Sequence, residues 1–192
     1  MKKLCIISVL LLIAAGTVSA DADTWSAEVF AGGSYSGGDA MGGIGVRVHR
    51  EFGEHFEAGF NLYAQSEVSG EYEDAGGKEY HLSSGFSTLV LIPKISIGKR
   101  WEIALPIETG SGLLQYRYSS EYREELKWTE EILDQVTHSV YSIGIEPRFL
   151  FGGNGALTIA AGYLGTGPLR TELAEDGELN GFWARAGYQY RF

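Results

Sequence analysis

Nine charged residues lie on the polar sides of segments in which polar and apolar residues alternate. They are Glu28, Arg47, Glu57, Glu102, Glu108, Glu146, Arg148, Arg185 and Arg191. Carboxylates and guanidinium groups that leave water must pair with each other, because an unpaired buried charge costs on the order of several kcal/mol. Such a set either fills an interior as an ion-pair network or lines a narrow polar conduit. The sequence leaves both interpretations open.

Hydrolytic chemistry has one weak candidate in the sequence. His81 precedes Ser83 by two residues, and such a pair becomes a nucleophile and base only when an acid orients the histidine. No carboxylate follows on the same segment, and the next one is Glu102. We therefore do not expect an enzyme. No spacing matches a calcium-loop signature, so neither a metal nor a cofactor is expected.

Three prolines fall on consecutive alternating segments. Pro93, Pro106 and Pro147 cannot donate a backbone hydrogen bond, and a closed sheet has no edge where this loss is harmless. One interpretation is a local bulge at each proline. The other is a weakened lateral seam, centred on the strands of Pro106 and Pro147, through which a lipid chain would reach the interior.

These side chains need strands to position them. Eight segments alternate with a period of two, which is typical of β-strands. They cover residues 25–35, 43–50, 56–67, 80–92, 101–108, 140–151, 156–164 and 182–192. The segment at 80–92 is less regular, because Leu89 and Leu91 lie opposite its other apolar residues. The pattern predicts an all-β protein.

The orientation of the strands decides between two kinds of barrel. A soluble, lipocalin-like periplasmic binder turns its apolar face inward, whereas a membrane barrel turns that face toward lipid. Aromatic residues near the strand ends suit a lipid–water boundary. Glycines on the polar faces suit a narrow lumen, and the strand lengths suit a tilted crossing of a bilayer. These features favour the membrane barrel.

The connections alternate between short and long, as they do in outer-membrane barrels with tight periplasmic turns and long external loops. Much of the acidic excess falls in the long connections. The connection over residues 121–138 shows an i, i+3, i+4 apolar pattern that also fits a short amphipathic helix. Either this segment is a solvated loop or it contacts a partner or the lipid headgroups.

Residues 1–20 have the layout of a cleaved signal peptide: a basic start, an apolar run and a small-residue exit at Val18-Ser19-Ala20. The alternative is an N-terminal membrane anchor. We expect one barrel domain over residues 21–192. Its 13 basic and 25 acidic residues, after Lys2 and Lys3 are set aside, exclude the basic face that nucleic acids require. The single cysteine, Cys5, lies inside the signal, so no disulfide is expected.

The signal, the eight strands, the alternating connections and the final YQYRF resemble the small eight-stranded outer-membrane barrels of the OmpA/OmpX type. The resemblance covers residues 25–192 and implies a transmembrane barrel in the outer membrane. Tyr188, Tyr190 and Phe192 are similar to the C-terminal assembly signal of such proteins. The resemblance also implies contact with outer-membrane lipid, lipopolysaccharide and the assembly machinery, and a monomeric state.

Fold does not fix activity, because this architecture hosts anchors, adhesins, enzymes and channels. We expect a structural or surface-interaction role, with acidic external loops and a lumen filled by the charged network. The alternatives are a small channel or lateral-path transporter for a polar or hydrophobic solute, and the soluble binder. A lipid A-modifying hydrolase or acyltransferase is the remaining alternative, although the sequence shows no matching catalytic motif.

Overall fold

The structure is a computed structural model that describes residues 24–36, 39–68, 72–74, 76–118, 132–151, 153–169 and 179–192. The expected signal peptide lies outside the described residues. The strands are β1 Trp25–Ser36, β2 Asp39–Glu51, β3 Phe56–Glu67, β4 Tyr72–Glu73, β5 Glu79–Ile97, β6 Trp101–Ala104, β7 Ile107–Tyr118, β8 Ile132–Phe151, β9 Gly155–Thr166 and β10 Gly181–Arg191. No helix in these ranges is long and apolar enough to cross a membrane.

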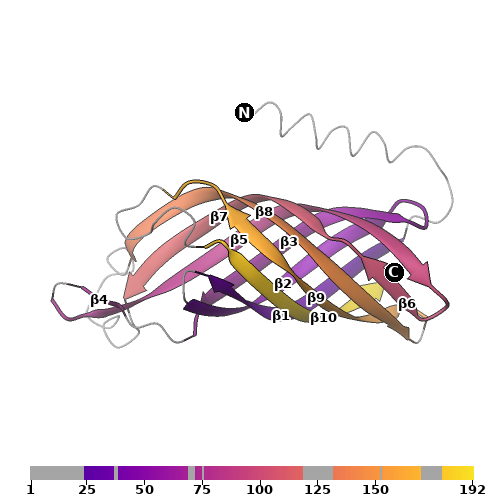
Figure 1. Cartoon of the computed structure of the whole chain (residues 1–192), viewed down its shortest axis with the longest axis horizontal. Helices are drawn as coiled ribbons and strands as arrows, with labels where there is room; N and C mark the ends of the chain where they lie inside the picture. Colours follow the sequence, from indigo (N-terminus) through magenta and orange to yellow (C-terminus); the bar gives the residue numbers. More distant parts are fainter. Residues whose placement is uncertain are drawn as a thin grey trace, which may run out of the picture.

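The strands form one closed antiparallel ring (Figure 1). β6 and β7 are two halves of a single strand, since both pair with β5 on one side and β8 on the other. β4 only extends β5. The remaining unit is therefore an eight-stranded barrel, and β1 closes it by pairing with β10. The predicted all-β, eight-stranded antiparallel barrel is confirmed.

The strands are strongly staggered around the ring. A path of paired residues that leaves β8 at Arg148 passes through Thr158, Gly187, Phe30, Gly45, Tyr63, Phe86 and Gly112, and returns to β8 at His138. The offset, 148 − 138, is ten residues. Such stagger requires tilted strands, and an eight-stranded barrel has an interior just wide enough for side chains.

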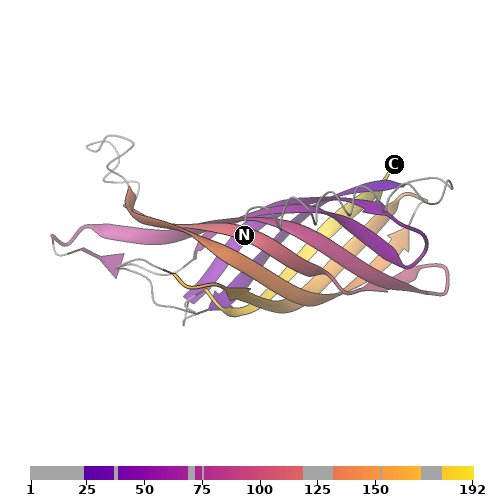
Figure 2. The same ribbon diagram turned by 90° about the horizontal axis from the view of Figure 1, so that it is seen from above.

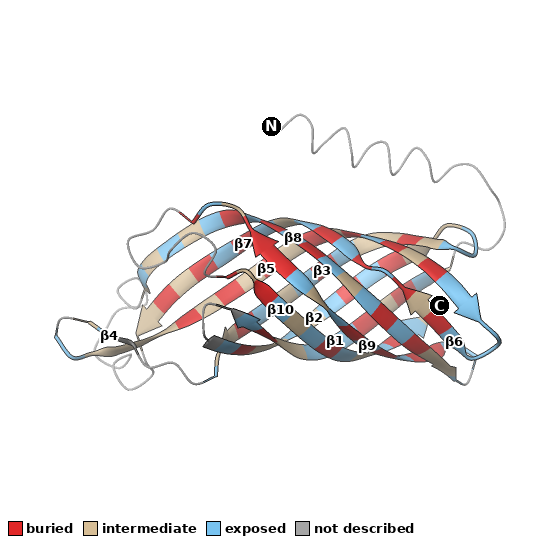
Figure 3. Ribbon diagram, in the orientation of Figure 1, coloured by how far each residue is buried: buried red, intermediate tan, exposed pale blue. Residues whose placement is uncertain are grey.

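Buried and exposed residues alternate along each strand (Figure 3). The exposed series is apolar, as in Ile44 at 71 % and Ile159 at 66 % exposure, whereas Arg47 and Arg148 are fully buried inside. The predicted orientation, with apolar residues outward, is thus confirmed. β5 is a partial exception: Leu82, Phe86 and Val90 point inward with the polar series, which explains its irregular pattern.

Three strands are longer than the sequence pattern indicates. β5 has 19 residues, β8 has 20, and the strand made of β6 and β7 extends to Tyr118, whereas β1, β2, β3, β9 and β10 have 11 to 13. The helix pattern over 121–138 is wrong for residues 132–138, because these pair with β7 as a strand. Residues 119–131 lie outside the described part. Cross-strand pairing outweighs local periodicity here, since it satisfies the backbone groups of both strands.

The extra residues of β5, β7 and β8 form an extension of the sheet, visible at the left of Figure 2 beyond the ends of β1 and β2. On its outer face, Ser87, Ser111 and Ser139 pair across the three strands, and Ser83, Gln115 and Gln135 do so farther out. Gln115 donates to Gln135 at 3.2 Å. Nearer the turns the same face carries Leu91, Ile107 and Ile143. Gly85, Leu113 and Thr137 form the row between the two polar ones, so the outer face changes from mainly apolar to mainly polar residues along the extension.

The inner face of this extension closes the barrel mouth with an apolar cap. Leu82, Leu114 and Tyr116 pack together with Met41 on β2. Leu169 and Leu179, from the connection between β9 and β10, complete the cap, and all six side chains are buried. The short turns lie at the opposite end of the barrel, with the C-terminus (Figure 1).

Candidate functional site

The lumen contains a network of buried ion pairs centred on Glu146. Arg47 donates to this carboxylate at 2.6 Å, Arg148 at 2.9 Å and Arg185 at 3.2 Å. These four residues come from three strands, β2, β8 and β10. Arg47 also forms an ion pair with Glu28, its cross-strand partner on β1. Counting residues from the strand ends in the sequence predicts that Glu28 lies beside Arg47 and Glu102 beside Arg148. The strand register has both pairs.

A second group of contacts continues the network toward the short turns. Arg148 donates to both oxygens of Glu57, at 2.9 and 3.0 Å. Glu57 also lies 2.7 Å from Lys94 Nζ and 3.2 Å from His49 Nε2. Arg191 and Glu102 are joined at 2.7 Å near the turn end. Every carboxylate of the network therefore faces at least one cation.

Three members of the network were not predicted from the sequence: Glu51, Lys94 and His49. Lys94 lies 2.8 Å from Glu51, and His49 contacts Glu57. All three continue the inward series of their strands at the turn end, so the alternation itself would have found them. The network then holds the six carboxylates of Glu28, Glu51, Glu57, Glu102, Glu108 and Glu146, with the five cations of Arg47, Lys94, Arg148, Arg185 and Arg191.

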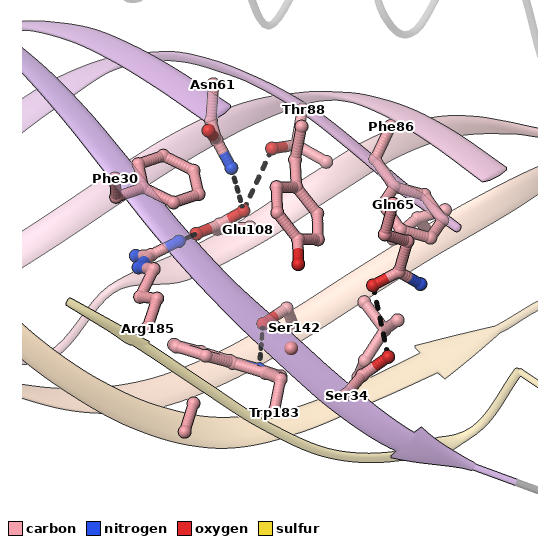
Figure 4. A pocket seen from close by; sticks show the side chains of 15 residues that line it. Phe30, Ser34, Asn61, Gln65, Phe86, Thr88, Glu108, Ser142, Trp183 and Arg185 are labelled. Atoms are coloured by element: carbon pink, nitrogen blue, oxygen red, sulfur yellow. Dashed lines mark hydrogen bonds and ion pairs between the residues drawn. The ribbon is translucent and has the colours of Figure 1, made fainter. Parts of the chain in front are cut away.

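The extracellular side of the network ends at Arg185. Its guanidinium lies 4.8 Å from the ring centre of Phe30 and 4.6 Å from that of Trp183. It also donates to Glu108 at 3.1 Å, and Glu108 accepts from Asn61 and Thr88 as well (Figure 4). Arg185 therefore joins a charged zone of the lumen to an aromatic one.

Beyond Arg185 lies a small chamber, here called the lumen chamber. Its walls include Phe30, Tyr63, Phe86, Val140, Leu164 and Trp183, with Ser34, Asn61, Gln65, Thr88, Glu108, Ser142 and Arg185 between them (Figure 4). The volume of this cavity is ≈ 40 Å³, enough for about three water molecules. The chamber lies between the charged network and the apolar cap.

Trp183 occupies its position because two facing strands carry glycine. Gly144 and Gly162 are paired on β8 and β9, and Gly162 is paired with Trp183. A Cβ added at Gly144 would lie 2.6 Å from Trp183 Cζ2 and 2.9 Å from the Ala161 carbonyl oxygen. We expect Gly144→Ala to lower the free energy of unfolding by about 1–3 kcal/mol through overpacking, measured by urea titration in lipid vesicles.

Gly85→Ala is the matched control for this prediction. A Cβ at Gly85 has its nearest neighbour, the Tyr63 carbonyl oxygen, at 3.9 Å. Alanine is preferred to glycine in strands by about 0.5–1 kcal/mol, so this variant should be neutral or slightly more stable. Equal losses in both variants would contradict the packing explanation.

The three prolines are not gathered at one interface. The carbonyl oxygen of Pro93 on β5 accepts a hydrogen bond from Leu105 N, in the break between β6 and β7. The carbonyl oxygen of Pro106, in the same break, accepts one from Gly144 N on β8. The β8–β9 pairing is interrupted between Ile145 and Arg148, around Pro147. The losses of hydrogen bonding are therefore distributed over three strand interfaces, whereas the lateral-seam hypothesis requires them at one.

His81 and Ser83 lie on the outer side of β5, where Ser83 Oγ donates to the Gln115 carbonyl oxygen at 3.4 Å. Glu102 is buried inside the barrel with Arg191. The structure thus does not bring the three together as nucleophile, base and acid. Among the described residues, no group of three His, Cys, Asp or Glu side chains has the geometry of a metal site.

The residues of the predicted assembly signal all lie on the outer face. Tyr188, Tyr190 and Phe192 are 40 %, 47 % and 65 % exposed, along one side of the last strand. Tyr188 packs against Phe151 on β8, at 5.9 Å between ring centres. Their positions are compatible with contact to lipid or to another protein.

The solved structures that align with this chain include outer-membrane proteins. Neisserial surface protein A aligns with a TM-score of 0.58 at 10 % identity, over 88 % of this chain and 97 % of that one. The fold is that of the small outer-membrane barrels. A major outer membrane protein of Thermus thermophilus aligns at 0.57 with 13 % identity, over 90 % and 100 % of the two chains.

A third outer-membrane barrel adds a bound ligand. Ail of Yersinia pestis, solved with the heparin analogue sucrose octasulfate, aligns at 0.53 with 12 % identity, over 88 % of this chain and 97 % of that one. No protein-family model and no curated protein matches the sequence. At these identities the similarity establishes the barrel fold, and the role of the protein has to be argued from its own residues.

Proposed function

We propose that the protein is a closed outer-membrane anchor that presents the β5–β7–β8 extension as a surface for interactions outside the cell. A cleaved signal over residues 1–20 would direct it across the inner membrane, and the exposed residues Tyr188, Tyr190 and Phe192 would be recognised by the assembly machinery. Its apolar outer face would contact outer-membrane lipid and lipopolysaccharide as a monomer.

The observation that carries this proposal is the filled lumen. Glu146 on β8 is bonded to Arg47 on β2 and Arg185 on β10, so the network crosses the barrel from one wall to the other. The apolar cap closes the same lumen at the extracellular end. A conduit needs a continuous hydrated path, and both layers oppose it.

Planar-bilayer recording tests closure. The purified barrel should give no conductance steps in salt solution. The applied voltage is kept within the range in which conducting barrels of similar size stay folded. Glu57→Gln and Arg148→Ala serve as comparisons, because a charged conduit should change its conductance with either substitution. Regular steps in the unmodified protein that disappear in these variants would support the channel alternative instead.

The extension supplies the proposed interaction surface. The extension, with the adjacent end of β3, β4 and the β4–β5 turn, carries Glu67, Glu73, Asp74, Glu79 and Asp134 against Lys78 and Arg117 among the described residues, which continues the acidic balance of the long connections. An acidic surface repels sulfated sugars, so the ligand seen with Ail is not expected here. We expect a partner with basic groups, or anionic lipopolysaccharide bridged by divalent cations.

Replacing residues 119–131 by a short glycine–serine linker tests the surface role. The described strands β7 and β8 are kept, so insertion and heat-modifiable migration on gels should not change. Cells that display the intact protein should be retained on at least one coating in a panel of basic and acidic peptides and glycans. Retention that is the same with the linker variant on every coating would contradict the proposal for this connection.

A pH effect is expected in the β4–β5 turn of the extension. Asp74 accepts from the backbone N–H of Lys78 at 2.9 Å and of Gly76 at 2.8 Å, and from the Tyr118 hydroxyl at 2.8 Å. These bonds, that of Lys78 first, lower the pKa of Asp74 below its ordinary 3.8. The hydrogen bond that the Tyr118 hydroxyl donates to Asp74 raises the pKa of Tyr118.

Because the folded pKa of Asp74 is lowered, its stabilisation is present above the unfolded pKa and is lost as the pH falls through the folded one. The Gly76 and Lys78 amides should therefore lose protection at acid pH, where protection is the intrinsic exchange rate at each pH divided by the rate that NMR measures. Asp74→Asn should show low protection of both amides already at neutral pH and lose this pH dependence of the protection. An unchanged acid response in that variant would assign the effect to another group.

A further inference from the structure

We propose that a pocket beside the β5–β6 turn binds the headgroup of an anionic phospholipid, of the phosphatidylglycerol class. This turn pocket lies at the end of the barrel that holds the short turns and the C-terminus (Figure 1). Six residues line it: Lys99 and Arg100 from the β5–β6 turn, and Phe149, Leu150, Phe151 and Gly153 from the end of β8 and the turn that follows. The proposal goes beyond the anchor function and rests on one part of it, the contact of the outer face with lipid.

The turn pocket has room for a headgroup and the upper part of an acyl chain. Its volume is ≈ 480 Å³, within the range of about 300–1,000 Å³ that is typical of sites for small molecules. In outer-membrane barrels the short turns face the periplasm. The proposed ligand is therefore a lipid of the periplasmic leaflet.

The backbone fixes the two walls of the turn pocket against each other. The Leu150 N–H donates to the Arg100 carbonyl oxygen at 2.8 Å, which continues the pairing of β6 with β8 by one residue. Each of the two turns contains a glycine with positive φ, Gly98 at 67° and Gly153 at 82°, a conformation that favours glycine. Lys99 and Arg100 are exposed, but the backbone that carries them is held next to β8.

Aromatic side chains on the outer face set the level of the turn pocket in the membrane. The rings of Trp101 and Phe149 have their centres 5.0 Å apart, and the row continues through Phe151 to Tyr188 at 6.5 and 5.9 Å. Trp101, Phe151 and Tyr188 are exposed. Such rows lie at the boundary between lipid and water. A lipid in contact with Phe149 and Phe151 therefore has its phosphate near the level of the β5–β6 turn.

The charge of the turn pocket is positive, in contrast to the acidic chain as a whole. Lys99 and Arg100 line it, and no acidic residue of the described part of the chain does. The β2–β3 turn carries Glu54, and the GGN of the β8–β9 turn has no charged residue. The β5–β6 turn is thus the short turn with two neighbouring cations.

This charge selects an anionic headgroup over a zwitterionic one. A phosphodiester with a net negative charge is attracted by both cations. The phosphate of phosphatidylcholine is attracted in the same way, but its ammonium group is repelled. The two lipids therefore differ in affinity although both contain phosphate.

The same phosphate chemistry is present in soluble anions, and the apolar lining decides against them. Lys99 and Arg100 are exposed, so they bind an anion from water only weakly. A phospholipid is held at this level by its acyl chains, and Phe149, Leu150 and Phe151 offer an apolar surface for the start of a chain. The occupant is therefore a lipid.

NMR of the purified barrel in nanodiscs tests the proposal. Phosphatidylglycerol replaces phosphatidylcholine of the same acyl chains in steps, while the indole N–H of Trp101, assigned by its loss in Trp101→Phe, and the Gly153 amide are followed. Both signals should shift and saturate. Lys99→Gln and Arg100→Gln should each need an about 3- to 5-fold higher share of phosphatidylglycerol for half of the shift, as expected for one basic side chain near a membrane surface. The variant with both substitutions should not saturate.

Arg50→Gln is the matched control. Arg50 is a basic residue at the same end of the barrel, but its guanidinium lies 5.4 Å from the ring centre of Phe52 and does not line the turn pocket. This variant should need the same share of lipid as the unmodified protein. An equal loss in Arg50→Gln, or a shift that grows linearly without saturation, overturns the proposal and shows general attraction of anionic lipid.

Soluble glycerol 3-phosphate, added to barrels in phosphatidylcholine alone, separates a lipid site from an anion site. It should not produce the shift, and a saturable shift with this compound overturns the assignment to a lipid. Heat-modifiable migration of the same samples separates this proposal from the anchor function. An inserted barrel that does not distinguish the two lipids overturns the turn pocket alone, whereas a barrel that fails to insert contradicts both.

Discussion

Glu146→Gln is expected to lower the free energy of unfolding by about 3–5 kcal/mol, because removing one partner of a buried ion pair leaves the other charge uncompensated. Here three cations lose the same partner: Arg47, Arg148 and Arg185 all donate to this carboxylate. Glutamine keeps the size and one acceptor oxygen, so the loss reports charge more than volume. Urea unfolding in lipid vesicles, followed by heat-modifiable migration, measures it.

Glu54→Gln is the control for this substitution, since Glu54 is exposed in the turn between β2 and β3 and should change stability by less than about 0.5 kcal/mol. The double variant Glu146→Gln with Arg185→Gln removes one acid and one base from the network. It should be less destabilised than the two single losses added together, because the residues interact directly. Strict additivity, or equal midpoints for Glu146→Gln and Glu54→Gln, would show that the network does not stabilise the barrel.

Ile159→Lys is expected to cost about 2–4 kcal/mol, the penalty of a basic side chain on the lipid face near the middle of a bilayer. Ile159 is near the middle of β9 and is 66 % exposed on the outer face. In water such a residue would tolerate lysine with little effect. The same vesicle titration measures this loss, and the yield of folded protein gives a second reading.

Phe182→Lys tests whether the cost depends on depth. Phe182 is also on the outer face, at 72 % exposure, but near the extracellular end of β10. Charges near the interface cost about 0–1 kcal/mol, so this variant should be clearly less affected than Ile159→Lys. Similar small effects at both positions would mean that the outer face is not in contact with lipid.

The regular strands could be predicted because one physical rule governs them. Where one face meets lipid and the other a charged lumen, as around Arg47 and Arg185, polar and apolar residues alternate strictly. The register of Glu28 with Arg47 then follows from counting. Glu51 and Lys94 continue the inward series just beyond the predicted segments 43–50 and 80–92, so the pattern within those segments does not report them.

The extracellular half could not be predicted in the same way. On β5 the inward Leu82 and Phe86 obscure the alternation. Leu82 belongs to the apolar cap, which needs Leu169 and Leu179 from a connection far along the chain, and Phe86 packs with Val140 and Leu164 on β8 and β9. Residues 132–138 show a helical period by themselves, and their pairing with β7 decides their structure. The chamber depends on gaps between side chains of seven strands, which no local pattern reports.

The wall-to-wall ion pairs constrain how the barrel forms. Arg47 and Glu146 are 99 residues apart in the sequence, and Arg148 and Glu57 are 91 apart. A single hairpin that entered the bilayer early would carry such charges without their partners, which is unfavourable in hydrocarbon. Insertion one hairpin at a time is therefore opposed. The strands should cross the bilayer together, as the ring closes, so slow folding limited by these distant contacts is the expected kinetic signature.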